Sequence, residues 1–146
     1  MKEETVFCFL AEDRASVYQG LLLSKSIRTF GGRVSNARIF ALVPMNADGL
    51  DEKIKKAYFD NKIEIMVFSK KYEDSLYPLG LKACAGAFAE DLLGEVSDNV
   101  IFLDSDSLLI NYEEDLFLKK DKAVGLRPVD KKLIGIQRFI RADKVV

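Results

Sequence analysis

Hydrophobic and polar positions along the chain alternate between two kinds of segment. Four short apolar runs have the length of β-strands, at residues 5–11, 38–43, 63–68 and 99–103, and segments with apolar positions at helical spacing lie between them. The run at 5–11 is apolar almost throughout, which is typical of a strand buried on both faces of a sheet. Strands that alternate with helices indicate βαβ units, a mostly parallel sheet and right-handed crossovers. The sequence therefore predicts an α/β fold, specifically a three-layer α/β/α sandwich.

The intervals between the strands predict three helices. The first is capped by Ser16 and stops at Gly31, and the second is a charged helix that begins at Asp48 or Asp51. The third covers residues 79–95, and the small residues that would let it approach a sheet closely are Ala83, Ala85, Gly86, Ala87 and Ala89. Two further elements, a helical turn and a strand, are predicted at 113–117 and 123–127.

Composition narrows the chemistry that the chain can perform. Its 146 residues suit one domain with a core that needs no disulfide or metal. A net charge of −1 argues against a general nucleic-acid or membrane-surface binder, because such proteins need a dense basic face. The absence of histidine excludes Ser-His-Asp and Cys-His catalysis and the usual zinc enzymes. Carboxylates, lysines, hydroxyls, backbone amides or a hard metal ion remain.

Cysteine usage and the N-terminal residues indicate where the protein works. Cys8 and Cys84 lie far apart in apolar or small-residue surroundings, which predicts buried structural thiols rather than a disulfide or zinc site. The acidic N-terminus runs straight into the first strand and does not resemble a secretory signal. No apolar run approaches the length of about 20 residues that spans a bilayer. We therefore expect a cytoplasmic protein with neither nucleic acid nor a membrane as its partner.

Two acidic clusters follow predicted strands. Glu12 and Asp13 come after the first strand, and Asp104 and Asp106 come after the fourth. In an open parallel sheet, ligands bind beyond the carboxyl ends of the strands. If the first and fourth strands are parallel, both clusters lie at the same edge of the sheet.

The spacing of Asp104 and Asp106 allows more than one interpretation. Two carboxylates about 4 Å apart repel by about 4 kcal/mol at an effective dielectric near 20. The fold tolerates this if the pair is splayed into water, if one carboxylate is protonated, or if a cation bridges them. Mg²⁺ and Mn²⁺ prefer oxygen ligands and usually share their coordination with substrate phosphates. The competing interpretation is a strand-to-loop turn whose aspartates accept backbone amide hydrogen bonds.

Other sites with paired acids fit less well. An EF-hand loop would need an oxygen ligand in place of Leu108 and glycine in place of Leu109. Aspartate-nucleophile phosphatases carry their Asp-x-Asp on the first strand and need further residues well downstream, and a two-carboxylate glycosidase uses separated acids. Glycine-rich phosphate loops are also missing from the sequence.

Three segments together carry a resemblance to a known family. They are 9–20 (FLAEDRASVYQG), 79–83 (LGLKA) and 100–117 (VIFLDSDSLLINYEEDLF), of which the last is the most specific. They resemble the nucleotide-sugar-binding half of a GT-A glycosyltransferase, a member of the nucleotide-diphospho-sugar transferase superfamily. They are similar in particular to the glycogenin-like retaining enzymes of glycosyltransferase family 8.

The resemblance implies a ligand and a set of residues that hold it. The ligand is a nucleotide sugar of the UDP or GDP type, and the cofactor is Mn²⁺ or Mg²⁺. Asp104 and Asp106 resemble the motif that reaches the ribose and the metal on the diphosphate, while Lys82 resembles a lysine near the donor phosphate. The positions that would contact the nucleotide sugar are Ala11, Glu12, Asp13, Lys82, Asp104 and Ser105. Glu12 departs from the small amide or hydroxyl residue common at its position, so the base preference stays open.

The C-terminal part departs from the family pattern. The resemblance defines a nucleotide-sugar-binding domain at 1–135 and leaves 136–146 as a divergent tail. Family members continue into an acceptor-binding region with a late histidine that completes the metal site, and this sequence has neither. One hypothesis is a glycosyltransferase-like domain, without the acceptor half, whose transfer activity is weak or absent. The alternative is a non-catalytic remnant whose exposed sheet edge pairs with a second copy, giving a homodimer.

Overall fold

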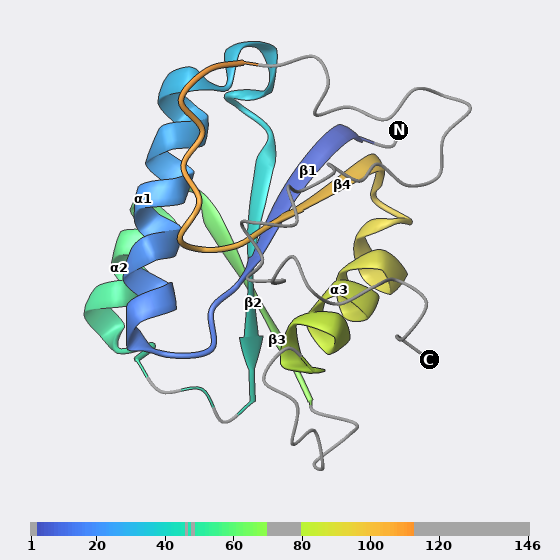
Figure 1. Cartoon of the computed structure of the whole chain (residues 1–146). Helices are drawn as coiled ribbons and strands as arrows, with labels where there is room; N and C mark the ends of the chain where they lie inside the picture. Colours follow the sequence, from blue (N-terminus) through green and yellow to red (C-terminus); the bar gives the residue numbers. More distant parts are fainter. Residues whose placement is uncertain (1–2, 46, 48, 70–79, 113–146) are drawn as a thin grey trace, which may run out of the picture.

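One parallel sheet organises the protein. The computed structural model describes residues 3–45, 47, 49–69 and 80–112. Its strands are β1 (Glu3–Leu10), β2 (Arg38–Pro44), β3 (Ile63–Phe68) and β4 (Ser97–Leu103). They pair in the order β3-β2-β1-β4, and every pair is parallel (Figure 1). The parallel sheet is confirmed, and β3 matches its predicted boundaries at both ends.

Helices cover both faces of this sheet. Helices α1 (Arg14–Phe30) and α2 (Glu52–Asp60) lie on one face, and α3 (Gly80–Leu93) lies on the other (Figure 1). A short 3-10 helix, η1 (Gly32–Val34), follows α1. The three-layer α/β/α sandwich is therefore confirmed. No helix within the described ranges combines the length and apolar character needed to cross a bilayer.

The start of α1 corrects one prediction. Asp13, not Ser16, is the N-cap: the Asp13 carboxylate accepts a hydrogen bond of 2.8 Å from the Ser16 amide. The Ser16 hydroxyl in turn accepts a hydrogen bond of 3.0 Å from the Asp13 amide. Both residue types favour N-caps, and here they form a reciprocal capping box with Ser16 at the third helical position. At α2 the choice between two aspartates is resolved, because Asp51 accepts from the Ile54 amide at 2.8 Å.

The small face of α3 is narrower than predicted. Ala85, Ala89 and Leu93 are buried against the sheet, whereas Ala83 and Ala87 are exposed. Residues four apart share one side of a helix, so a single stripe reaches the sheet and the other alanines face outward.

Strand β1 lies between two apolar clusters. Side chains of Phe7 and Phe9 pack with α1 and α2, while Val6, Cys8 and Leu10 pack on the side of α3. All five are at most 4% exposed, which confirms the prediction of a strand buried on both faces. Neighbouring side chains on a strand point to opposite faces, so alternate residues of β1 pack against the two layers of helices.

The cysteines are free thiols in this core. Cys8 is buried, and burial raises its pKa to about 12, so it stays a neutral, structural thiol. Cys84 is half-buried and packs against the same cluster. The prediction of a buried structural thiol is confirmed for Cys8, while Cys84 is partly open to solvent.

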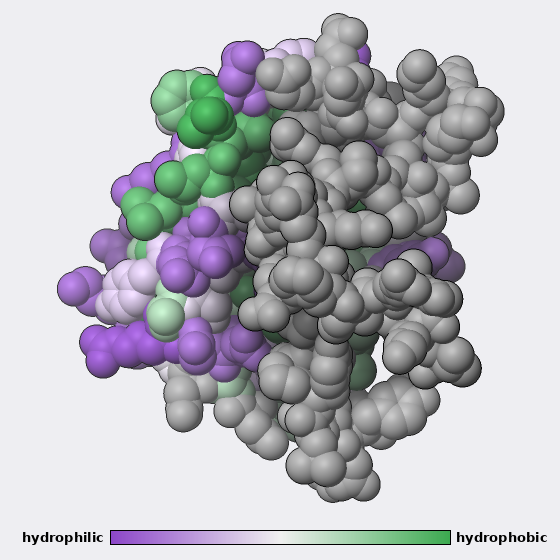
Figure 2. Space-filling model, viewed as in Figure 1, coloured by the Kyte–Doolittle hydropathy of each residue, from purple (hydrophilic) through white to green (hydrophobic). Residues whose placement is uncertain are grey.

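Beyond β4, residues 104–112 turn back along α1 (Figure 1). The Leu109 amide donates a hydrogen bond of 2.9 Å to the Ser26 hydroxyl, and Leu109 packs on the cluster that α1 covers. Apolar surface gathers at the upper left of this face, where the segment lies over α1 (Figure 2). The large apolar side chains exposed on these two elements are Tyr18, Leu22, Phe30, Leu108 and Ile110. The elements predicted at 113–117 and 123–127 and the tail 136–146 lie outside the described residues.

Close packing of α1 on β1 gives a test of the fold. A methyl group at Gly20 would overlap the ring of Phe9, which is fully buried. We expect Gly20→Ala to lower the free energy of unfolding by about 1–3 kcal/mol, because the ring cannot move without disturbing the core.

The matched control is Gly86→Ala in α3, where the added methyl would meet no other heavy atom within 4 Å. This variant should stabilise the protein by about 0.5–1 kcal/mol through helix propensity alone. Urea unfolding of both variants measures the difference, and changes of equal sign and size would contradict the packing of Gly20 on Phe9.

Candidate functional site

The carboxyl edge of the sheet brings the two acidic turns together. Strands β1 and β4 are parallel neighbours, and Phe9 is level with Leu103. The turn at 11–13 and the turn at 104–106 therefore leave the sheet side by side. This confirms the expectation that both clusters share one edge.

Lys82 reaches this edge from α3, the helix on the face of the sheet opposite to α1 and α2. It lies in the first turn of α3, and its Nζ is 2.6 Å from Oδ1 of Asp104. The hydrogen bond to Asp104 raises the pKa of Lys82. Partial desolvation lowers this pKa, and the negative charges of Asp104, Asp106 and Glu12 raise it. We refer to Glu12, Asp104 and Asp106, the three carboxylates whose charges act on the Lys82 ammonium, as the carboxylate cluster. The Lys82 and Asp104 side chains are 41% and 49% exposed, so the cluster is open to a ligand.

The position of Lys82 is unfavourable for its own helix. The N-terminal end of a helix carries partial positive charge, and a cation there costs about 0.3–1 kcal/mol. The first turn of α3 contains no acidic residue to offset this. The compensating charge comes instead from Asp104 across the sheet edge. A local preference broken in this way is typical of a functional site.

Ser105 is fixed by a contact that the sequence did not predict. Its hydroxyl donates a hydrogen bond of 3.2 Å to the Gln19 side-chain oxygen on α1. The Ser107 amide donates to the Asp104 carbonyl at 3.0 Å, closing the turn. Ser105 is therefore half-buried against α1, while Asp104 and Asp106 on either side of it are exposed. The only signal for Gln19 in the sequence is a polar residue beside the buried stripe of α1.

Two of the predicted nucleotide contacts have structural partners. Asp13 caps α1, and its hydrogen bonds with the Ser16 backbone and hydroxyl lower its pKa below the ordinary value. Ala11 is fully buried, and its amide donates a hydrogen bond of 2.9 Å to the Leu42 carbonyl. Glu12, between them, is exposed and belongs to the carboxylate cluster. Of the first turn, Glu12 is thus the residue whose charge acts on Lys82.

The donor set fits one kind of metal site. Within the part of the chain that the structure describes, no group of three or more histidine, cysteine or carboxylate side chains is arranged to hold an ion. Mg²⁺ and similar ions are commonly held by one or two carboxylates, with substrate phosphates and waters completing the shell. Asp104 and Asp106 are therefore the residues that would hold an ion shared with a phosphate-bearing ligand.

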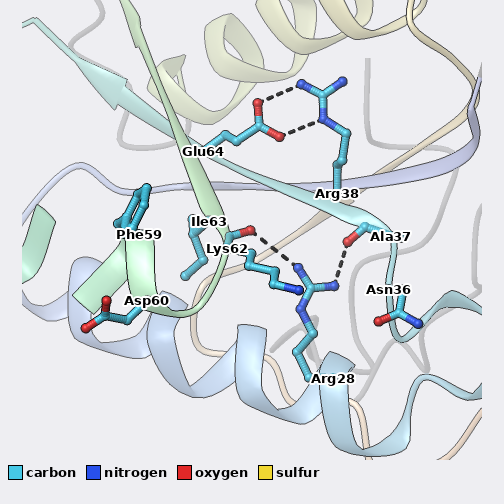
Figure 3. Close-up of a pocket in the computed structure, with 9 residues that line it drawn as sticks. All are labelled: Arg28, Asn36, Ala37, Arg38, Phe59, Asp60, Lys62, Ile63 and Glu64. Atoms are coloured by element: carbon cyan, nitrogen blue, oxygen red, sulfur yellow. Dashed lines mark hydrogen bonds and ion pairs between the residues drawn. The ribbon is translucent and has the colours of Figure 1, made fainter. Parts of the chain in front are cut away.

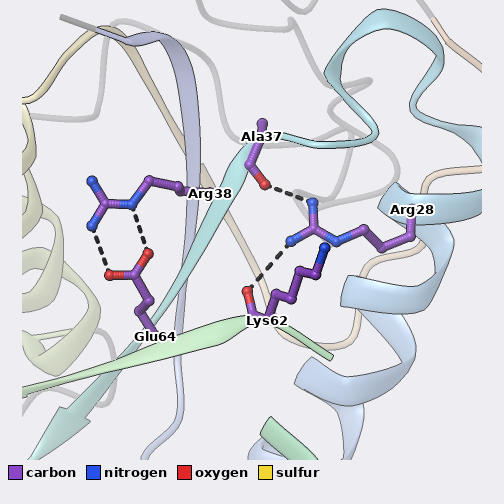
Figure 4. A network of polar contacts seen from close by, with 5 residues as sticks. All are labelled: Arg28, Ala37, Arg38, Lys62 and Glu64. Carbon is purple, nitrogen blue, oxygen red and sulfur yellow. Dashed lines mark hydrogen bonds and ion pairs between the residues drawn. The ribbon is translucent and has the colours of Figure 1, made fainter. Parts of the chain in front are cut away.

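A cleft of about 610 Å³ lies at the other edge, where β2 and β3 begin (Figure 3). Its arginines already have partners (Figure 4). Arg28 donates to the carbonyls of Ala37 at 2.6 Å and Lys62 at 3.4 Å. Arg38 holds the Glu64 carboxylate through two contacts of 2.6 Å. These contacts make the cleft a structural joint between α1, β2 and β3.

Comparison with known proteins adds one finding. Residues 7–131 match a family described as the Rhodobacterales glycosyltransferase domain. The matched range includes both acidic turns and Lys82. A search of curated proteins gave no match.

The cap at Asp13 predicts a stability change that depends on pH. Asp13→Ala removes the acceptor for the Ser16 amide and should lower the free energy of unfolding by about 1 kcal/mol. Asp13→Asn keeps an oxygen at the cap and should cost much less. The folded pKa of Asp13 lies below its ordinary value of about 3.9, so the ionised carboxylate contributes stability above about pH 4. That contribution is lost as the pH falls through the folded pKa.

Urea unfolding from neutral pH down to about pH 3 checks both effects. Wild-type protein should lose stability relative to Asp13→Asn at the acid end, since the amide does not titrate. A difference between the two proteins that stays constant over this range would show that Asp13 does not act as a charged cap.

Proposed function

The chain belongs to the Rhodobacterales glycosyltransferase domain family, and from that premise we propose that it binds a nucleotide sugar through a divalent metal at Asp104 and Asp106. The observation that carries this proposal is the contact between Lys82 and Asp104 at the carboxyl edge, where segments distant in sequence bring an ammonium group onto a carboxylate cluster. Ligands of open parallel sheets bind at this edge. The family and the location of the charges support the same ligand class.

The proposed cofactor is Mn²⁺ or Mg²⁺, and the proposed donor is of the UDP or GDP type. Asp104 and Asp106 supply hard oxygen ligands, and the diphosphate of the donor completes the shell. When bound, the metal would supply positive charge next to the diphosphate, which would stabilise the nucleoside diphosphate as a leaving group. We also place the domain in the GT-A group, similar to glycosyltransferase family 8. The strand order β3-β2-β1-β4 with an Asp-x-Asp directly after β4 supports this.

The chain's own residues divide the work of binding. Lys82 offers a half-exposed ammonium with three donors to the diphosphate, next to the positive end of α3. Ser105 is held by Gln19 and keeps the two aspartates on the outer side of the turn. Glu12 offers a carboxylate that accepts hydrogen bonds from ribose hydroxyls or from the base. Ala11 and Asp13 contribute by fixing the backbone of the first turn.

Donor binding in this proposal requires no acceptor, so it is measurable in this chain directly. Calorimetric titration with UDP and with GDP, each with Mn²⁺ or with EDTA, tests it. We expect binding of one nucleotide only when metal is present. We expect Asp106→Asn to weaken that binding more than tenfold, because it removes a charged ligand from a site with at most two protein carboxylates on the ion.

Asp98→Asn is the matched control, since Asp98 is exposed near the start of β4, at the edge of the sheet opposite to the turn that carries Asp106. It should bind as the wild type does. Equal affinity with and without metal, or an Asp106→Asn variant that binds like Asp98→Asn, would contradict the proposal.

A second candidate role is self-association through β3. Within the described residues β3 pairs only with β2, and its residues Ile65 and Val67 are 36% and 56% exposed. An apolar edge strand without a blocking charge on that face favours pairing with another strand. Antiparallel pairing of two copies about Ile65 would set Ile63 of each copy opposite Val67 of the other.

Sedimentation velocity over a range of concentrations tests this role. The wild type should form a dimer, and Val67→Lys should be monomeric because the ammonium would be buried against the second copy. Leu22→Lys, a like change at an exposed apolar residue of α1, serves as the control and should remain dimeric. A wild type that stays monomeric at every concentration would exclude the pairing.

A further inference from the structure

We propose that Lys82 is an exchangeable counter-ion, which occupies Asp104 until a metal and a diphosphate arrive together and then moves to the diphosphate. This inference rests on the proposed function and adds to it how the site discriminates between a bare metal ion and a metal–nucleotide complex. It starts from one contact, the 2.6 Å ion pair between Lys82 Nζ and Asp104 Oδ1.

Asp104 cannot serve two cations equally. It is the first carboxylate of the proposed metal pair, and one of its oxygens already holds the ammonium. Because Lys82 also feels the charges of Asp106 and Glu12, it neutralises part of the whole cluster. An ion that binds to Asp104 and Asp106 therefore lowers the attraction that keeps Lys82 in place, and like charges repel.

The ion pair is suited to exchange because it is open to water. Lys82 and Asp104 are 41% and 49% exposed, and exposed pairs of this kind are held weakly. The guanidinium of Arg38, by contrast, grips Glu64 with two parallel contacts. Lysine carries its charge on a flexible stem with rotatable donors, so the ammonium can change partner without a change in the backbone.

The two possible ligands have opposite consequences for Lys82. When a bare metal ion binds, the ammonium loses Asp104 and gains no new anion. When the ion arrives with a diphosphate, the ammonium loses Asp104 and gains phosphate oxygens. Lys82 thus weakens the binding of bare metal and strengthens the binding of the metal–nucleotide complex, which couples the two ligands positively. The site would in this way remain free of metal until the nucleotide is present.

Electron paramagnetic resonance of Mn²⁺ measures this directly, because the free ion and the bound ion give distinct signals. We expect Lys82→Met to bind Mn²⁺ alone about fivefold more tightly than the wild type, the upper range for an exposed ion pair. The same variant should bind Mn²⁺–UDP or Mn²⁺–GDP more weakly. A loss of fold would lower both affinities, so the opposite signs identify exchange.

Two further variants complete the experiment. Lys82→Arg keeps the positive charge beside Asp104 and should bind Mn²⁺ alone no more tightly than the wild type does. Lys55→Met removes a lysine that pairs with Glu52 on the exposed side of α2 and should change neither affinity. Lys82→Met with unchanged or weaker Mn²⁺ binding, in a chain whose wild type binds Mn²⁺–nucleotide, overturns the exchange and leaves the proposed function standing. A wild type that binds no nucleotide with metal overturns the proposed function, while tighter Mn²⁺ binding by Lys82→Met would still support Lys82 as the counter-ion.

Discussion

The pairing of β1 on both of its edges is the constraint on which the rest of the described structure depends. The strand hydrogen-bonds to β2 on one side and β4 on the other, and its side chains fill both apolar clusters. A parallel strand buried in this way cannot slip by one residue without moving its whole apolar set to the wrong face. Its register is therefore fixed, and with it the level at which the acidic turns leave the sheet.

The two edges of the sheet use their charges differently. At the edge where β2 and β3 begin, Arg28 donates to backbone carbonyls and Arg38 holds Glu64 in a two-point contact. Each guanidinium group there links neighbouring elements of the fold. At the carboxyl edge, Lys82 makes a single contact in the open. A rigid, planar cation suits a permanent joint, and a flexible point charge suits a site where partners change. The residue types at the two edges agree with a structural role for one and a binding role for the other.

The sequence predicted the strands well because each is a short apolar run with clear boundaries. It also placed both acidic turns at one edge, which follows from the parallel sheet alone. It missed the cap at Asp13, since Asp13 and Ser16 are both good capping residues and only the folded backbone shows how they pair. The contact between Ser105 and Gln19 joins residues far apart in the chain, and no local sequence pattern predicts it.

For Lys82 the resemblance gave a location but not a partner. Residues after the first strand, in the third helix and after the fourth strand were expected near one ligand, and the structure adds that Lys82 and Asp104 are in contact. Such a pairing depends on how far α3 is turned and shifted across the sheet. That placement follows the stripe of Ala85, Ala89 and Leu93 buried against the sheet, whereas the sequence pattern also included small residues that the structure leaves exposed.

This contact also answers the electrostatic question that the Asp-x-Asp spacing raises. Neighbouring carboxylates can be accommodated by water, by protonation or by a bridging cation; here both aspartates are exposed, and a cation of the chain itself, Lys82, pairs with Asp104. The ammonium sits where the dipole of α3 disfavours it, so the helix bears a cost that the carboxylates offset. Each of the two features would be unfavourable alone, and together they offset each other at the sheet edge. For the proposed function this means that the protein itself already balances part of the charge that a bound ligand would meet.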